Sequence, residues 1–159
     1  MDDLIYDRTQ EDVDRAIELN DKYSRGTITA QELVEWDNGL KGTYNYTDIN
    51  RIEQWSQYIA QQLYTYGYLN LNITVKTNWI MSEFPTSLEM KRIRDNVQKL
   101  KNAFISFTQV PSNLEKMTYQ KANDLEKVIN ELNTLINNMI ASFYYSNEVY
   151  SGEVWKWIM

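Results

Sequence analysis

The residues of this chain that could do chemistry most readily are its carboxylates. Glu11, Asp12 and Asp14 lie close together near the start, and Glu32 and Glu35 share one expected helix. A hydrolase with paired carboxylates needs two acids that face each other across a cleft, one of them in an apolar setting. The local sequence marks no such pair, and acids in the first turn of a helix stabilise its N-terminus. We therefore expect these acids to be structural.

The 159 residues include no histidine and no cysteine, which removes most other catalytic and metal chemistry. Zinc sites, haem ligation by His or Cys, and Ser-His or Cys-His nucleophiles all require one of these residues. The sequence also contains no phosphate-binding loop and no GxGxxG motif. We predict a protein that is not an enzyme and that has no catalytic residue, no metal and no cofactor.

The segment Asp21–Glu32 has the length of a calcium-binding EF-hand loop, with acids at its first and last positions and Gly26 at its sixth. However, Tyr23 and Arg25 occupy two positions that must supply oxygen ligands, and arginine brings a positive charge to the place of the ion. We instead expect a helix–turn–helix corner in which Gly26 ends one helix and Thr29 caps the next.

Charge is spread unevenly along the chain, whose net charge is −6. Residues 1–40 contain 11 acidic and 4 basic residues, whereas residues 88–101 contain 2 acidic and 5 basic residues. The basic group consists of Lys91, Arg92, Arg94, Lys99 and Lys101. An acidic protein gains little from a polyanion, and no aromatic platform lies among these bases, so we expect no nucleic-acid partner. A solvated face, or a surface that meets an acidic neighbour, is the preferred interpretation.

Aromatic and apolar residues gather at the C-terminal end. The residues predicted to make assembly contacts are Tyr145, Tyr150, Trp155, Trp157 and Ile158. Helical periodicity fades here, and the two tryptophans stand two apart as in an extended chain, so residues 146–159 are expected to form an extended arm. The arm either folds back onto its own core or inserts into another subunit, where Tyr and Trp give a large contact area with little loss of entropy.

Helices must provide the scaffold, because proline and glycine are scarce and apolar residues recur at spacings of three and four. The predicted N-caps are Thr9, Thr29, Thr47, Thr86 and Thr118. The second and fourth begin capping boxes, with glutamate three residues later. The apolar seam of the fourth helix is expected to comprise Met90, Ile93, Val97, Leu100, Phe104 and Phe107.

Residues 69–77 alternate apolar and polar side chains, which is typical of a short strand or an extended segment. A single strand is not stable in water, so this segment must pair, lie against the helices or belong to a longer loop. The expected fold is therefore all-α, a bundle of about five helices in which the last two long helices form an antiparallel pair.

We expect one domain over residues 1–145, with residues 1–40 as an acidic sub-lobe. No run of 18 apolar residues is present, so a spanning helix and a membrane partner are not expected. The acidic start of the chain also lacks the basic and apolar regions of a signal peptide, which favours synthesis and folding in the cytoplasm.

Six stretches of the sequence, in order along the chain, resemble one family of small helical proteins. They are LIYDRTQEDVDRAIELNDKY at 4–23, GTITAQELVEW at 26–36, GLKGTYNYTDINRIEQWSQYIAQQL at 39–63, TNWIMSEFPTSLEMKRIRDNVQKLK at 77–101, MTYQKANDLEKVINELNTLI at 117–136, and YYSNEVYSGEV at 144–154. The family is encoded among the tail, baseplate and tail-fibre genes of phages and prophages of Gram-positive bacteria. The resemblance implies a virion or tail-assembly component that is present in several copies and contacts other tail proteins.

Three functions are compatible with these features. The first is a non-enzymatic structural protein of a bacteriophage tail or baseplate that acts through contacts between subunits. The alternative is a cytosolic helical adaptor or regulator that binds one protein partner through a helix face. The third is an enzyme acting on cell-wall glycans, which would require a pair of carboxylates in a cleft.

Overall fold

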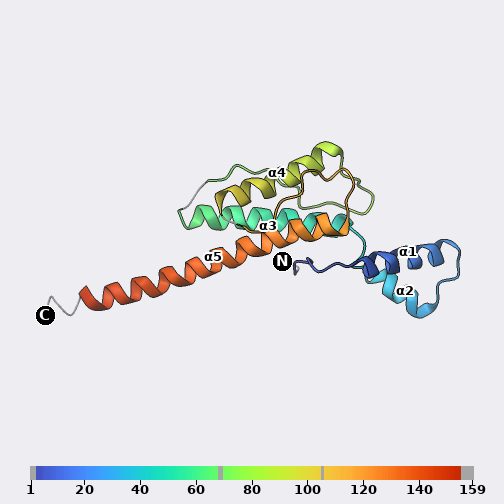
Figure 1. Cartoon of the computed structure of the whole chain (residues 1–159), viewed down its shortest axis with the longest axis horizontal. Coiled ribbons are helices and arrows are strands. Elements are labelled where there is room, and N and C mark those ends of the chain that lie inside the picture. The colour runs from blue at the N-terminus through green and yellow to red at the C-terminus, as the bar shows by residue number, and fades with distance from the viewer. Residues whose placement is uncertain (1–2, 68–69, 105, 155–159) are drawn as a thin grey trace.

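The computed structural model describes residues 3–67, 70–104 and 106–154, with side chains through residue 142. Within these ranges the chain forms helices and contains no strand, which confirms the predicted all-α fold (Figure 1). The helices are α1 (Gln10–Ser24), α2 (Ala30–Asp37), α3 (Tyr46–Thr65), α4 (Ser87–Ala103) and α5 (Tyr119–Val154). They match the five helices that the sequence predicts in number and order.

Local capping explains where most of these helices begin. Thr9, Thr29 and Thr86 each accept a hydrogen bond from the backbone three residues later, and each belongs to a complete capping box. The predicted cap of the third helix is wrong, because Asn45 rather than Thr47 is the N-cap. Asn45 Oδ1 accepts from the Thr47 backbone N–H at 2.8 Å, so Thr47 already lies inside α3.

Helices α3, α4 and α5 contact one another and enclose the main core, while α1 and α2 pair beside them (Figure 1). The core is therefore shared by these three helices. Its buried apolar side chains are Ile49, Ile52, Ile59, Ala60, Leu63, Trp79, Ile93, Val97, Leu100, Leu114, Leu125, Val128, Ile129, Leu132 and Ile136. Burial of each large apolar side chain contributes roughly 1.5–3 kcal/mol to the stability of the fold.

The apolar seam expected in the fourth helix is wrong at its C-terminal end. Helix α4 ends at Ala103, the backbone of Phe104 is extended, and the Phe107 side chain is 88% exposed. Glu131 on α5 provides the physical reason. Its Oε2 accepts from the backbone N–H of Phe107 at 3.0 Å and of Thr108 at 3.1 Å, which holds a loop where the helix would otherwise continue.

The alternating segment at 69–77 forms no strand over its described residues, 70–77. Leu71 and Ile73 pack against the core, and the Thr74 carbonyl accepts from Arg92 and Asn96 of α4 at 2.7 Å. Of the three possibilities left open by the sequence, the segment therefore lies against the helices of its own chain.

The extended arm predicted for residues 146–159 is wrong for residues 146–154, because α5 continues as a helix to Val154. No proline follows Pro111, and a helix that has already formed gains one hydrogen bond for each residue added. Tyr145 and Tyr150 therefore belong to α5, although their side chains lie outside the described part of the structure. Residues 155–159, which include the predicted contacts Trp155, Trp157 and Ile158, also lie outside it.

Candidate functional site

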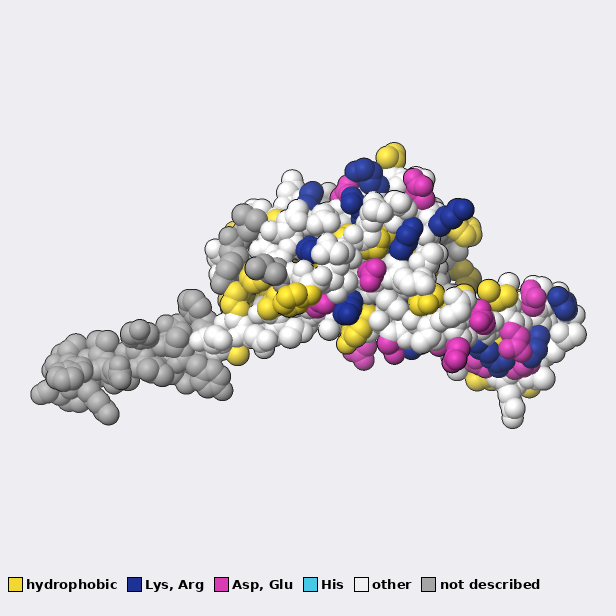
Figure 2. All heavy atoms as spheres, viewed as in Figure 1, with side chains coloured by type: hydrophobic (Ala, Val, Ile, Leu, Met, Phe, Trp, Pro, Cys, Tyr) yellow, Lys and Arg dark blue, Asp and Glu magenta, His cyan; other side chains and the backbone are white. Residues whose placement is uncertain are grey.

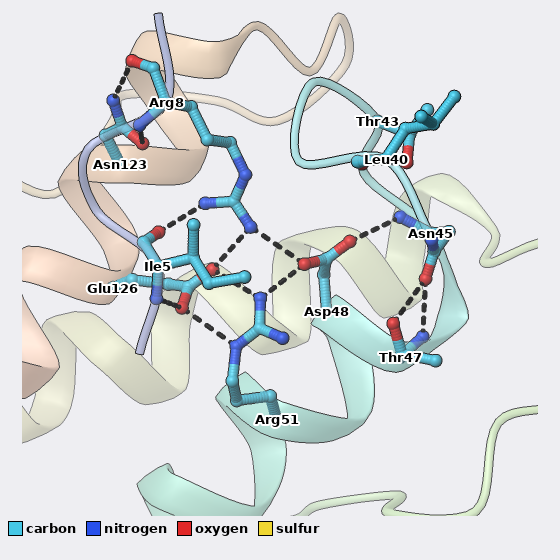
Figure 3. A network of polar contacts seen from close by, with 10 residues as sticks. All are labelled: Ile5, Arg8, Leu40, Thr43, Asn45, Thr47, Asp48, Arg51, Asn123 and Glu126. Atoms are coloured by element: carbon cyan, nitrogen blue, oxygen red, sulfur yellow. Dashed lines mark hydrogen bonds and ion pairs between the residues drawn. The ribbon is translucent and has the colours of Figure 1, made fainter. Parts of the chain in front are cut away.

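Four charged side chains form a buried network at the junction of the N-terminal segment, α3 and α5 (Figure 3). Arg8 Nη2 lies 2.7 Å from Asp48 Oδ1 and 2.9 Å from Glu126 Oε1. Arg51 donates through Nε and Nη2 to the two oxygens of Glu126, both at 2.9 Å, and also pairs with Asp48. All four side chains are at most 6% exposed. Two guanidinium groups thus neutralise two carboxylates inside the protein.

Backbone donors complete the network and link it to the chain start. The Ile5 N–H donates to Glu126 Oε2 at 2.5 Å, and the Asn45 N–H donates to Asp48 Oδ2 at 2.8 Å. Every carboxylate oxygen of the network therefore receives at least one hydrogen bond from the protein. A general base or a metal ligand needs an oxygen that faces its substrate or ion, and this arrangement provides none. Its role is to anchor residues 5–8 to α3 and α5.

The surroundings of the network favour fixed charges. Burial raises the pKa of Tyr44, whose ring lies 5.8 Å from the Arg8 guanidinium carbon. Burial alone would lower the pKa of Arg51, but the hydrogen bonds and negative charges of Glu126 and Asp48 together outweigh this effect and raise it. Both groups therefore keep one protonation state across the physiological range, which suits a structural element better than a proton-transfer site.

A second buried acid, Glu53 of α3, organises the segment before α4. Glu53 accepts from the Trp79 indole N–H at 3.1 Å and from the Lys76 backbone N–H at 2.9 Å. Arg92 pairs with both of its oxygens, at 2.5 Å and 2.7 Å. Glu53 thus holds Trp79 in the core and fixes the 74–79 segment across α3 and α4.

The basic residues of α4 serve mainly to hold loops. Arg92 and Lys99 donate to backbone carbonyls of the 70–77 segment. Arg94 donates to the Pro111 carbonyl at 2.9 Å, and Lys101 donates to the Thr108 carbonyl at 2.7 Å. These bases are therefore neither a free cationic patch nor only a solvated face, since most of them fasten the segments on either side of α4.

Most of the acids considered for catalysis in the sequence have structural partners, and Glu32 and Glu35 both lie close to Arg15, at 3.9 Å and 2.7 Å. Asp12 completes the cap of α1, and Glu35 pairs with Arg15 at 2.7 Å. Glu32 completes the cap of α2 and pairs with Lys22 at 2.5 Å, at the expected corner where Gly26 has a positive φ of 66°. Figure 2 shows the acidic and basic side chains gathered together over α1 and α2. Among the described residues no cluster of three or more acids is arranged to hold a metal ion.

A groove of about 630 Å³ runs between α1, the α2–α3 connection and the start of α3. Apolar side chains dominate its walls, including Ala16, Ile17, Trp36 and Met81. Asp37 is the single acid among the described residues that line it. The groove therefore does not provide the pair of carboxylates that a glycan hydrolase requires.

The sequence reasoning missed the four residues of the central network. Glu126 carried a usable signal, because it stands beside Leu125 and Val128 on the apolar face of its helix, and a buried carboxylate requires a cationic partner. No such sequence signal marks Arg8 or Arg51, since nothing in the local sequence distinguishes them from surface arginines.

The candidate assembly surface is the C-terminal half of α5. Among the side chains that the structure describes, which end at residue 142, the last fully buried one on this helix is Ile136, and the helix backbone runs on to Val154. Figure 1 shows this part of α5 extending past the ends of α3 and α4. The described part of α5 thus presents a length of helix that its own bundle does not enclose.

The chain matches no protein-family model, no curated protein sequence and no solved structure. Over the described ranges, none of the helices combines the length with the hydropathy needed to cross a lipid bilayer.

Proposed function

We propose that this protein is a non-enzymatic structural component of a bacteriophage tail or baseplate and acts through contacts between subunits. Its partners are other tail or baseplate proteins and copies of itself. The family resemblance supports the place in the particle. The geometry supports the mode of action, because the buried acids and bases are occupied in holding the fold together.

One observation carries the proposal most directly: α5 continues to Val154, and its backbone extends past the ends of α3 and α4 (Figure 1). The 18 residues of α5 after Ile136 extend roughly 27 Å, and an isolated helix of that length is marginal in water unless it packs against something. A subunit of a larger particle gains a docking element from such an extension.

The test is the protein composition of purified particles from the phage or induced prophage that encodes this chain. Quantitative mass spectrometry is expected to find the protein in a fixed ratio to the major tail protein. Its presence in the infected cell together with its absence from mature particles would instead support the cytosolic adaptor.

A further inference from the structure

The groove between α1, the α2–α3 connection and the start of α3 is open to solvent. Ile17 of α1 and Met81, which lies before α4, contribute to its walls and are 58% and 76% exposed. Trp36 of α2 also lines it. Its volume of about 630 Å³ is typical of a pocket that buries most of a small ligand. The groove is therefore large enough to take the anchoring side chains of a peptide.

The charge of the groove narrows the choice of occupant. Asp37 is the only charged side chain among the described residues that line it, and no described base forms an ion pair with Asp37. Charged groups at an interface are ordinarily matched by the opposite charge on the partner. An occupant that suits this groove combines large apolar side chains with one positive charge.

One segment of this chain has that combination. Residues 155–159 read Trp-Lys-Trp-Ile-Met, so Lys156 stands between two tryptophans and is the only charged residue of the five. The chain has 5 tryptophans, and no other two of them lie so close together in the sequence. Tryptophan is among the side chains that most often provide the binding energy of a protein interface.

Within one molecule, this segment cannot reach the groove. The groove shares Val13, Gly42 and Thr43 with a neighbouring hollow, which is bordered by Tyr119 and Ala122 at the start of α5. From there α5 runs as one helix of 36 residues, about 54 Å long, away from α1 and α2 (Figure 1). The five residues that follow Val154 extend at most about 18 Å. The segment can therefore occupy only the groove of another molecule.

We infer that residues 155–159 of one copy dock in the groove of a second copy, with the two tryptophans against its apolar walls and Lys156 beside Asp37. Each copy then uses its groove for one neighbour and its segment for another. Head-to-tail contacts of this kind close into a ring or continue as a filament. The inference rests on the proposed function, in that it specifies the contact between copies of the protein.

The first experiment measures the mass of the full-length protein by light scattering after gel filtration at several concentrations. The wild type should exceed its chain mass of 18.9 kDa as the concentration rises. Ile17→Lys in the groove, and Trp155→Ser combined with Trp157→Ser in the segment, should each give monomers. Val34→Lys is the matched control, because Val34 is 60% exposed on α2 but does not line the groove, and it should assemble like the wild type. A wild type that is monomeric at every concentration, or an Ile17→Lys variant that assembles like Val34→Lys, overturns the inference.

An equal mixture of the two monomeric variants distinguishes head-to-tail contact from symmetric pairing. The segment variant keeps an intact groove and the groove variant keeps an intact segment, so together they can form one contact and no second. The mixture should therefore reach twice the chain mass and stop there. A mixture that stays monomeric overturns the inference.

A charge exchange tests the pairing of Lys156 with Asp37. Asp37→Lys and Lys156→Asp should each weaken association about tenfold, and both changes in one chain should restore it. A double variant that associates no better than either single variant overturns the pairing. The circular dichroism of every variant verifies that the bundle is folded. Head-to-tail assembly of a protein that is absent from particles would reject the proposed function alone. A particle protein that is monomeric at every concentration would reject this inference alone.

Discussion

Arg8 and Glu126 lie 118 positions apart in the sequence and form a buried ion pair, with 2.9 Å between Nη2 and Oε1. The pair joins the N-terminal segment to α5, and Asp48 and Arg51 add one negative and one positive charge to it, so the four buried groups sum to zero. If one charged group of such a site is removed, its partner remains as an unpaired charge in a region of low polarity. This lowers the stability of the fold by more than the intact ion pair contributes to it.

We therefore expect Glu126→Gln to lower the free energy of unfolding by about 3–5 kcal/mol. Urea denaturation followed by circular dichroism measures this value. Combining Glu126→Gln with Arg8→Met again leaves equal numbers of positive and negative charges. The double variant should therefore lose less stability than the sum of the two single variants.

Arg15→Met serves as the control for this series, since Arg15 pairs with Glu35 at the surface. Such exposed pairs contribute less than about 1 kcal/mol. A loss for Glu126→Gln no larger than that of Arg15→Met would contradict the anchoring role of the network.

The stability of the α1–α2 corner at low pH depends on the ionisation of Glu32. The hydrogen bonds from Lys22, followed by those from Thr29, lower the pKa of Glu32 from 4.5 to about 2. The folded state therefore favours the carboxylate. Its contribution to stability is complete above pH 4.5 and disappears as the pH falls through 2.

A side-chain carboxyl titration of Glu32 by nuclear magnetic resonance should have its midpoint near pH 2. Lys22→Met should move that midpoint upward, toward the ordinary value of 4.5. A wild-type midpoint already at the ordinary value would mean that the corner does not hold Glu32 in this way.

The α2–α3 connection passes so close to α1 that Gly42 admits no side chain. A methyl group there would overlap the Asp12 carbonyl and stand 2.6 Å from the Val13 nitrogen. Both are backbone atoms of α1 and cannot rotate away, so Gly42→Ala should cost about 3 kcal/mol, at the upper end for overpacking.

Gly39→Ala is the matched control for this substitution. Gly39 has a positive φ of 89° but no atom within 4 Å of the added methyl group, so the change should cost only about 1 kcal/mol of backbone strain. Thermal denaturation compares the stabilities of the two variants. Equal losses of stability would show that close packing around Gly42 does not constrain this position.

Two neighbouring bases of α4 should behave differently. Arg92 is the only side-chain cation paired with Glu53 in the described structure, whereas Lys91 pairs with Asp95 at the surface. Arg92→Met should cost about 3 kcal/mol and alter the near-ultraviolet circular dichroism of Trp79, because Glu53 also holds that indole. Lys91→Met should cost less than about 1 kcal/mol and leave the Trp79 signal unchanged.

Features that depend on residues a few positions apart could be predicted from the sequence. The helix starts at Thr29 and Thr86 follow from capping boxes in which all the partners lie within one turn. The sequence predicts the cap of α3 two residues late because Asn45 and Thr47 can both cap a helix, and Asp48 three residues after Asn45 decides between them. The number of helices follows from periodicity, which is also a local property.

Features that depend on distant partners could not be predicted in this way. Helix α4 ends before Phe107 because Glu131, 24 positions later, binds the loop backbone. The bases of α4 acquire their roles only when the loops fold against them. The sequence predicts the end of α5 too early for a different reason: its aromatic residues favour an extended arm, although no proline interrupts the helix.

The anchoring of Arg8 by Glu126 has a consequence for how the protein is made. A ribosome releases Arg8, Asp48 and Arg51 well before Glu126, so the emerging chain carries one carboxylate for two guanidinium groups until α5 appears. The apolar faces of α3 and α4 that pack against α5 also remain uncovered until α5 has been synthesised. We expect the bundle to close only late in translation, so messages truncated before α5 would yield fragments that cellular proteases remove.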